Sequence, residues 1–514
     1  MRDLVVHEIL ADAAYQHSFT PIISGDVHLT YASLYERVVR LANSLGRLGM
    51  SPGTVVGVLD VNSHRYLELT YALSMVRAVI HTINFRLPLK DLLWTLQQAH
   101  DEWLFLGEAF AELGDPVESL VPRVVWMGKE LRPNSQPHYE SLISDGRYQV
   151  PDSASLVSPN DRYSLFYTTG TTGQPKGLSY THRQMLSGAL QIAHHLALHD
   201  TGATLSSRDI IMPAIPFFHI HGWGVPFTAP YIGAGLVLPE RGGPAQQRAL
   251  IDQYGVTWSN MVPTQLVMLL DAAPGPLNLK ILTGGSPLSM GLARRAASRG
   301  IRVSVIYGGS DQLGSAISTA PGLTGDAQLE ALASWLTPFP MVRIEVRDAD
   351  GRPVEPDGAT LGEVWVQSPW LPRGYLDNPS ASDAAFRDGW FRSGDLATRS
   401  PDGHIMVWDR MSDAVKSGGE WIVTSRVESI ISELPGVKAV AVIAVSDERW
   451  GERPKAIIVA DSTVDAHQVR DVLNRAVQAG RLAKFWIPEI IDWVNELPMT
   501  SAGKINKAKL RESS

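Results

Sequence analysis

The sequence predicts an α/β protein. It has a large N-terminal domain of layered α/β subdomains with a small antiparallel strand-rich subdomain, followed by a small α+β C-terminal domain. Three observations support this prediction. Apolar runs of strand length alternate with segments of helical spacing through most of the 514 residues. After about residue 340 the strands are short and alternate in and out, and from about residue 410 helices and strands form a compact last unit.

The first region has a β–α–β rhythm. Residues 54–61 (TVVGVLDV) and 79–84 (VIHTIN) are apolar runs of strand length, and residues 65–78 between them have helical spacing. The same order recurs where the strand-like 301–307 (IRVSVIY) follows the helix-like 289–300. Alternation of this kind predicts helices layered on largely parallel sheets.

The later regions have a different pattern. Residues 341–348 (MVRIEVRD) and 362–369 (GEVWVQSP) alternate like antiparallel strands, and turn signals such as DADG and SPDG separate such strands. The last unit is expected to contain a helix, two strands, a second helix and a final strand at 425–436, 437–447, 453–461, 465–480 and 489–498. We therefore place a domain junction at Asp409–Arg410, between an N-terminal domain of residues 1–409 and a C-terminal domain of residues 410–514.

Composition limits the possible functions. The net charge of −8 argues against a general nucleic-acid binder, and 44% hydrophobic residues suffice for a sizeable core. The absence of cysteine excludes disulfides, zinc–thiolate sites and a cysteine nucleophile, and it fits a reducing compartment. We find no apolar run of about 18 residues and no signal-peptide pattern, so we expect no membrane span and a cytoplasmic location. A homodimer is expected only because homodimers are common among soluble proteins.

One loop is rich in small residues. Residues 167–177 read YTTGTTGQPKG, in which glycines admit backbone N–H groups to an anion, hydroxyls add donors, and Lys176 adds a cation suited to phosphate. A predicted strand at 162–167 precedes the loop and a predicted helix at 181–196 follows it, which is a common context for phosphate binding. The spacing is not that of the Walker loop, and by composition alone a small-residue surface loop explains the segment equally well.

The full string closely resembles the phosphate-loop signature of the adenylate-forming superfamily, which includes acyl-CoA synthetases, aryl-CoA ligases, luciferases and peptide-synthetase adenylation domains. Further stretches resemble the superfamily in the same order over nearly the whole chain; they are 29–53, HTINFRL (81–87), PFFHIHGW (216–223), YGGSD (307–311), GWFRSGDLA (389–397), DRMSDAVKSGGEWI (409–422) and PMTSAGKINKAKL (498–510). The resemblance implies ATP, Mg²⁺ and coenzyme A as ligands and a mobile C-terminal domain.

The resemblance also implies a nucleotide site. Asp395 would accept hydrogen bonds from the ribose hydroxyls of ATP, and Arg410 would hold the ribose from the junction side. Lys504 would bridge the substrate carboxylate and the α-phosphate, because a cation between two anions offsets their repulsion. From the residues alone, Asp395 also fits a turn cap and Lys504 a solvated lysine. The implied catalytic residues are Lys504, His219 and Lys176. The implied ATP- or AMP-binding positions are Thr168, Thr169, Gly170, Thr171, Thr172, Gly173, Lys176, Gly284, Gly285, Ser286, Tyr307, Gly308, Ser310, Asp311, Asp395, Arg410 and Lys504.

YGGSD departs from the superfamily pattern, which has Thr and Glu where this chain has Ser310 and Asp311. Serine keeps the hydroxyl, and aspartate keeps the charge on a side chain one methylene shorter. Mg²⁺ keeps several waters when it binds to proteins, so a water can fill the difference. The resemblance implies that Asp311 is the metal ligand, because the Thr and Glu of the superfamily pattern contact the phosphates and Mg²⁺.

The acid would lie near PFFHIHGW. The resemblance places His219 near the substrate carboxylate, whereas an isolated histidine among aromatics more often belongs to a core. A His pair at 219 and 221 could also suggest a metal, but no third ligand follows in spacing. The predicted acyl-pocket residues are His219, His221, Trp223, Trp258, Met261, Gly308 and Gly309.

The junction would carry the second half of the reaction. By resemblance, the C-terminal domain rotates about Ser412 and brings the KSGGEW face to the thiol of CoA. Two glycines would let the pantetheine arm pass close to the backbone. The predicted CoA and hinge residues are Ser412, Lys416, Gly418, Gly419, Glu420 and Trp421.

These features predict an ATP-dependent acid–CoA ligase. A medium-chain fatty acid or a cyclic or aryl acid would form acyl-AMP and pyrophosphate, and CoA would then give acyl-CoA and AMP. One alternative is an adenylating enzyme whose acceptor is an amine or a carrier-protein thiol. A second is an inactive nucleotide-binding scaffold, supported only by Ser310 and Asp311.

Overall fold

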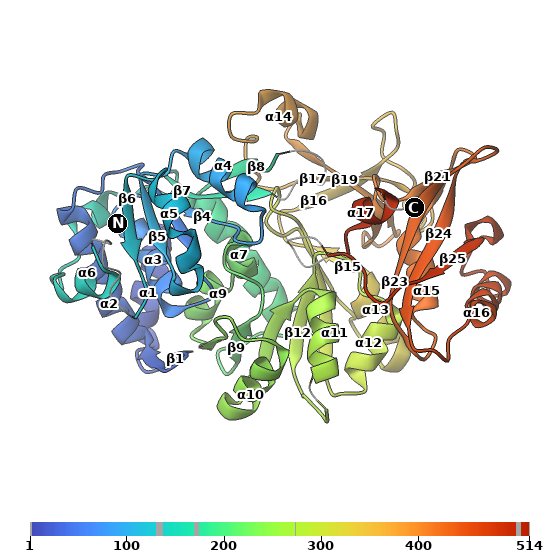
Figure 1. Cartoon of the computed structure of the whole chain (residues 1–514), viewed down its shortest axis with the longest axis horizontal. Coiled ribbons are helices and arrows are strands. Elements are labelled where there is room, and N and C mark those ends of the chain that lie inside the picture. Colours follow the sequence, from blue (N-terminus) through green and yellow to red (C-terminus); the bar gives the residue numbers. More distant parts are fainter. Residues whose placement is uncertain (1–2, 130–136, 169–173, 273, 500–504, 513–514) are drawn as a thin grey trace.

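Three β-sheets organise the chain in this computed structural model, which describes residues 3–129, 137–168, 174–272, 274–499 and 505–512 (Figure 1). A six-stranded and a fourteen-stranded sheet make up the N-terminal part. A five-stranded sheet lies at the C-terminal end of the molecule, on the right in Figure 1.

The six-stranded sheet has the order β6-β5-β3-β4-β7-β8, and β8 alone is antiparallel to its neighbour. Its strands are β3 (Val55–Leu59), β4 (Val79–Thr82), β5 (Trp103–Leu106), β6 (Arg123–Trp126), β7 (Arg162–Thr168) and β8 (Lys176–Thr181). Helix α3 (His64–Met75) joins β3 to β4, so the expected β–α–β unit is confirmed. The side chain of Ser63 caps α3 by accepting a hydrogen bond from the backbone N–H of Tyr66. Every residue of α3 except Arg65 is buried, so α3 lies inside the core.

The fourteen-stranded sheet contains both the parallel and the antiparallel strands that the sequence predicts. Its strands are β1 (Pro21–Ser24), β2 (Val27–Thr30), β9 (Ile210–Pro213), β10 (Gly235–Leu238), β11 (Trp258–Met261), β12 (Lys280–Gly284), β13 (Arg302–Tyr307), β14 (Ala316–Ser318), β15 (Leu336–Pro338), β16 (Arg343–Arg347), β17 (Gly362–Gln367), β18 (Phe386–Arg387), β19 (Trp390–Arg399) and β20 (Ile405–Arg410). The strands from β1 through β10, β9, β11 and β12 to β13 pair in parallel, and β14 to β20 pair antiparallel. The predicted antiparallel strands thus continue the main sheet through β14 and β15.

Helices cover both sheets. They are α1 (Val6–Gln16), α2 (Tyr31–Arg47), α4 (Leu89–Ala99), α5 (Gly114–Glu118), α6 (Tyr139–Ser144), α7 (His182–Leu198), α8 (Ile220–Trp223), α9 (Val225–Ile232), α10 (Pro244–Tyr254), α11 (Pro263–Ala272), α12 (Met290–Ala297), α13 (Gly325–Ser334) and α14 (Pro379–Ala385). Helix α2 begins at a capping box in which the side chains of Thr30 and Ser33 each accept a backbone N–H of the other residue. Among the described residues, none of the helices combines the length and the apolar character that crossing a bilayer requires.

A second core forms after β20. The last sheet has the order β22-β21-β24-β23, with β25 beside β24, and the helices α15 to α17 accompany it. These elements are β21 (Val415–Ser417), β22 (Glu420–Ile422), α15 (Thr424–Ile431), β23 (Val437–Asp447), β24 (Gly451–Ala460), α16 (Ala466–Gln478), β25 (Ile490–Trp493) and α17 (Lys507–Glu512). Their buried apolar side chains form a cluster of their own. Strand β20 still belongs to the main sheet and ends at Arg410, so the change of sheet falls within 411–414; the junction at Asp409–Arg410 stays a prediction.

Candidate active site

Strands β7 and β8 flank the small-residue loop. Strands β7 and β8 are antiparallel, and Thr168 lies opposite Lys176. Helix α7 begins only at His182, after β8, where Thr181 forms a capping box with Gln184. The expected strand and helix are confirmed as β7 and α7, but the loop does not lead directly into the helix, because β8 stands between them. The predicted phosphate-binding residues Thr169, Gly170, Thr171, Thr172 and Gly173 lie outside the described residues.

Three predicted residues from three strands meet at one carboxylate. On adjacent strands β19 and β20, Asp395 pairs with Arg410, and Arg410 Nε lies 2.9 Å from Asp395 Oδ1. The hydroxyl of Tyr307, at the end of β13, donates to Asp395 Oδ2 at 2.7 Å. The carboxylate is buried, whereas 54% of the Arg410 side chain is exposed. Both oxygens of Asp395 thus have a polar partner, and the guanidinium of Arg410 is the more exposed member of the cluster.

The charges of this cluster affect one another. Asp395 raises the pKa of Arg410 although burial acts in the opposite direction. Burial raises the pKa of Tyr307 well above its ordinary value, and the neighbouring carboxylate of Asp395 adds to that effect. The hydroxyl of Tyr307 therefore keeps its proton at ordinary pH and donates it in a hydrogen bond to Asp395, which is also paired with Arg410.

Ser310 and Asp311 lie beside this cluster, in a loop that two tyrosines hold. The hydroxyl of Tyr180 donates to the carbonyl oxygen of Ser310 at 2.7 Å, and the hydroxyl of Tyr375 donates to Asp311 Oδ1 at 2.5 Å. Burial raises the pKa of Asp311, and the Tyr375 hydrogen bond opposes that rise. The ring of Tyr375 also lies 4.9 Å from Lys176 Nζ, a cation–π contact. Sequence reasoning missed Tyr375, because nothing in its local sequence reports a contact with a residue 64 positions away.

The predicted acid-binding segment has an unusual backbone. Residues 220–224 all have positive φ, with values of 43°, 41°, 54°, 52° and 81° for Ile220, His221, Gly222, Trp223 and Gly224. For L-residues this left-handed conformation costs about 1–2 kcal/mol each, so the three residues other than glycine store several kcal/mol of strain. Such strain persists only where surrounding contacts impose the conformation.

Of the seven predicted acyl-pocket residues, Gly308 and Gly309 follow β13 and are half-buried, and the other five divide into two groups. His219 and Trp223 are partly exposed, and a Cβ built on Gly284 would lie 3.4 Å from the indole of Trp223, so this segment adjoins the predicted nucleotide loop. His221, Trp258 and Met261 are fully buried. His221 Nε2 lies 2.8 Å from Ser164 Oγ, and burial lowers the pKa of His221 to about 3, so this ring is neutral at ordinary pH. The pocket roles of the buried group stay predictions.

Comparison with known proteins agrees with this geometry. The AMP-binding enzyme family matches residues 10–376, and the AMP-binding enzyme C-terminal domain matches residues 426–504. The chain belongs to the AMP-binding enzyme family. It is 34% identical to a long-chain-fatty-acid–CoA ligase of Thermus thermophilus, over 95% of this chain and 91% of that protein. It is 32% identical to a medium-chain-fatty-acid–CoA ligase of Ectopseudomonas oleovorans, over 99% of this chain and 96% of that protein.

Solved structures of other CoA ligases have the same fold. The crystal structure of the anthranilate CoA ligase AuaEII in complex with anthranoyl-AMP superposes with a TM-score of 0.88 at 22% identity, covering 99% of this chain and 97% of that chain. The predicted fold class is confirmed. The predicted enzyme class is also confirmed: the chain is an AMP-forming acid–CoA ligase whose reaction uses ATP, Mg²⁺ and CoA.

Asp311 of this AMP-binding enzyme has the chemistry of a Mg²⁺ ligand. Mg²⁺ prefers oxygen donors and is commonly held by one or two carboxylates together with substrate phosphates. In the part of the chain that the structure describes, no three His, Cys, Asp or Glu side chains gather into a metal site. A single carboxylate beside the predicted phosphate loop therefore fits a cation that arrives with the nucleotide.

Asp311→Asn is expected to weaken the apparent affinity for Mg²⁺ about tenfold, because the amide keeps the shape but loses the charge. Pyrophosphate release measured over a range of Mg²⁺ concentrations tests this, and the rate should recover at high Mg²⁺. Tyr375→Phe, which removes the hydrogen bond but leaves the carboxylate, should shift the titration less. An unchanged Mg²⁺ titration of Asp311→Asn would contradict the assignment.

The predicted thioester residues lie on one hairpin. Gly418 and Gly419 are the turn between β21 and β22, with φ of 60° and 92°. Two-residue hairpin turns of this hand favour glycine at both positions, so the turn itself explains the pair without a ligand. Lys416 Nζ lies 5.5 Å from the ring centre of Trp421, and Ser412 and Glu420 are exposed. Lys504 lies outside the described residues.

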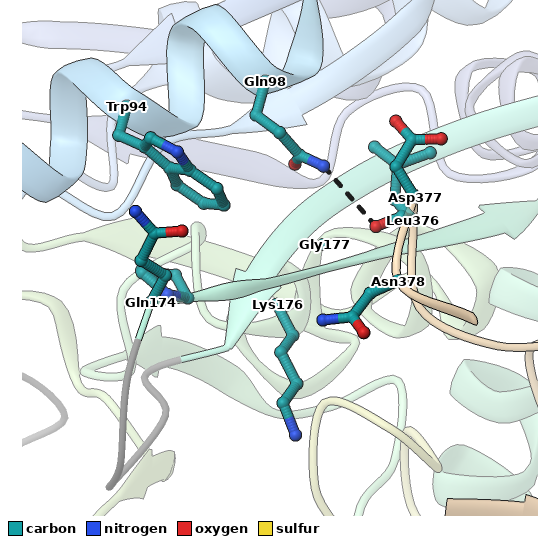
Figure 2. A pocket seen from close by; sticks show the side chains of 9 residues that line it. Trp94, Gln98, Gln174, Lys176, Gly177, Leu376, Asp377 and Asn378 are labelled. Atoms are coloured by element: carbon teal, nitrogen blue, oxygen red, sulfur yellow. Dashed lines mark hydrogen bonds between the residues drawn. The ribbon is translucent and has the colours of Figure 1, made fainter. Parts of the chain in front are cut away.

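A pocket of about 390 Å³ opens beside Lys176 (Figure 2). Trp94 and Gln98 from α4 form one wall, and residues 376–378 form the opposite wall, with Gln98 Nε2 donating to the carbonyl oxygen of Leu376 at 3.5 Å. None of these wall residues belongs to a motif, which is why the sequence did not indicate the pocket. Helix α4 and the segment before α14 therefore lie beside residues 174–177, at the end of the small-residue loop.

Proposed function

We propose that this ligase activates a medium-chain fatty acid or a related cyclic or aryl acid. In the first step the carboxylate attacks the α-phosphorus of ATP, which forms acyl-AMP and releases pyrophosphate. In the second step the sulfur of CoA attacks the acyl carbon and AMP leaves. The acid class is supported by relatives that are named as medium-chain and long-chain fatty-acid ligases and as a benzoate–CoA ligase.

The observation that carries the adenylation step of the proposal is the cluster of Tyr307, Asp395 and Arg410. A buried carboxylate that faces a half-exposed guanidinium is suited to a ribose diol, since carboxylates accept hydrogen bonds from two neighbouring hydroxyls. Lys176 and the loop before it bind the phosphates. Lys504 offsets the negative charge that gathers as the carboxylate meets the α-phosphate.

The other residues of the N-terminal domain bind the acid, the base and the metal, and the C-terminal domain serves the CoA step. His219 and Trp223 bind the acid, Tyr307 and Gly284–Ser286 lie at the base, and Asp311 helps to hold the metal. Mg²⁺, when bound, neutralises phosphate charge. The domain after the junction turns about Ser412, and the hairpin at Lys416–Trp421 then serves the CoA step. The glycine turn is compatible with this role but does not require it.

The test is pyrophosphate release with Mg·ATP across a panel of acids, with and without CoA. The panel spans short to long fatty acids, benzoates, cyclohexane acids and amino acids. We expect release that depends on medium-chain or ring acids and speeds up with CoA. Release that is indifferent to CoA would indicate an amine or carrier-protein acceptor, and no release with any acid while ATP still binds would indicate the inactive scaffold.

We further propose that the enzyme acts in the cytoplasm and forms a homodimer. The cysteine-free composition supports a reducing compartment. The dimer is supported only by its frequency among soluble proteins. Light scattering after gel filtration measures the mass directly, and a mass of 56.2 kDa would mean a monomer.

A further inference from the structure

The segment 213–224 lies between the two N-terminal sheets and exposes only two side chains. All its residues are buried except His219 and Trp223. The backbone N–H of Trp223 donates to the carbonyl oxygen of His219 at 3.4 Å, so the two residues stand one turn apart. The left-handed turn that separates them therefore decides where these two side chains lie relative to each other, and Trp223 lies beside Gly284 of the predicted nucleotide loop.

Two buried asparagines bind the backbone of this segment. Asn62 Nδ2 donates to the carbonyl oxygens of Pro213 and Ile215, both at 2.9 Å, and its Oδ1 accepts the N–H of Phe217 at 2.7 Å. These bonds use both donors of the Asn62 amide and an acceptor. Asn62 follows β3 and is 5% exposed.

Asn260 holds the turn itself. Its Nδ2 donates to the carbonyl oxygen of Gly222 at 2.8 Å, and its Oδ1 accepts the N–H of Ile215 at 3.3 Å. Asn260 lies in β11 and is fully buried. It thus ties the middle of the left-handed turn to the start of the segment.

Three further side chains complete the set. Thr82 donates to the carbonyl oxygen of Phe218 at 3.1 Å, Ser164 pairs with the ring of His221, and Gln265 donates to the carbonyl oxygen of Ala214 at 3.1 Å. Asn62, Thr82 and Ser164 come from the six-stranded sheet and the segments that follow its strands, whereas Asn260 lies in the main sheet and Gln265 in α11 after it. Both sheets therefore hold one strained segment from opposite sides.

We propose that Asn62 and Asn260 are positioning residues for recognition of the carboxylic acid. By fixing the left-handed turn they hold Trp223 beside the nucleotide loop at Gly284 and set the position of His219 one turn before it. The proposal rests on the proposed acid-binding role of His219 and Trp223. It adds that discrimination among acids depends on two buried residues, Asn62 and Asn260.

Asn260→Ala is expected to raise KM for the acid about tenfold or more, while KM for ATP changes less than about twofold. The preference among acids should also become broader, because the turn relaxes toward the right-handed form. Steady-state kinetics over the acid panel, with thermal melting of each variant, measure these effects.

Ser259→Ala is the matched control. Ser259 precedes Asn260 in β11, is fully buried, and donates to the carbonyl oxygen of Met212 at 2.6 Å, just outside the segment. It should lose stability without any change in the ratio of the two KM values. If Asn260→Ala does not fold, Thr82→Val, which keeps the shape and loses one hydrogen bond to Phe218, should raise KM for the acid by about threefold.

The outcomes separate the two proposals. If Trp223→Ala leaves KM for the acid unchanged, the acid-binding role of the segment is wrong. If Trp223→Ala raises KM for the acid but Asn260→Ala and Thr82→Val shift both KM values equally, the segment binds the acid and the positioning role is overturned.

Discussion

Replacing Asp395 by alanine is expected to reduce adenylate formation by about 10²–10³-fold, mostly through KM for ATP. The carboxylate lies 2.9 Å from the guanidinium of Arg410 and 2.7 Å from the hydroxyl of Tyr307. Its removal takes away the proposed ribose acceptor and leaves Arg410 without its nearest counter-charge. Hydrogen bonds to charged groups contribute about 1.5–3 kcal/mol each, so the loss of two accounts for an effect of this size.

Pyrophosphate release at varied ATP, with ATP binding by calorimetry, measures this effect. Asp395→Asn keeps the acceptor for Tyr307 without the charge, and we expect about a tenfold loss. Thr398→Val is the control, because Thr398 is also buried on β19 but bonds the indole of Trp408 instead. An Asp395→Ala enzyme with the parent KM for ATP would mean that the ribose binds elsewhere.

Lys507→Met is expected to lower the stability of the C-terminal unit by about 3–5 kcal/mol, because it leaves buried carboxylates without their cation. The ammonium of Lys507 lies 2.7 Å from Glu428 Oε1 and donates to Thr424 Oγ1 at 2.7 Å, with Asp409 Oδ1 at 3.9 Å. Asp409 also accepts the hydroxyl of Thr424 at 2.9 Å and the N–H of Ser425 at 3.1 Å. The side chain of Lys507 thus ties α17 to α15 and to the end of β20.

The effect should depend on pH in a defined direction. Burial raises the pKa of Asp409 to about 6, although Lys507 acts to lower it. A carboxylate whose pKa rises on folding contributes stability below its unfolded pKa of about 4, and that contribution is lost as pH rises through 6. Without Lys507 the pKa of Asp409 rises further, so the variant should fall below the parent most strongly above pH 6 and least near pH 4.

Chemical denaturation between pH 4 and pH 8 measures this dependence. Lys438→Met is the control, because Lys438 pairs with Asp461 at 2.6 Å on the surface and its loss should leave the unfolding curve nearly unchanged. Equal losses for the two variants, or a loss for Lys507→Met that does not change with pH, would contradict the role given to Lys507. Since α17 begins three residues after Lys504, slower adenylation by Lys507→Met is a further expected result.

Local sequence patterns predicted much of the fold because the spacing of apolar residues along a short segment indicates whether it forms a strand or a helix. The apolar runs at 54–61 and 79–84 became β3 and β4, and the segment between them became α3. Strand β8 was missed because it begins at Lys176, inside the motif itself, and its residues KGLSYT contain no apolar run like those of β3 and β4.

The candidate site likewise contains residues that motifs indicated and residues that only the structure revealed. Motifs indicated Tyr307, Asp395 and Arg410, and the strand register brings these three together. Tyr375, Asn62 and Asn260 belong to no recognised motif, and each acts through a hydrogen bond to a residue tens to more than a hundred positions away.

The sequence by itself determined the family, the fold class and the chemical types needed for an acid, a nucleotide and a thiol, because these depend on residue identity and spacing. Only the tertiary structure decided which side chains hold the strained turn at 220–224 and which carboxylate Lys507 neutralises. The physical reason is that a left-handed turn and a buried charge are unfavourable in an isolated segment. Contacts from distant strands and helices are what make them stable.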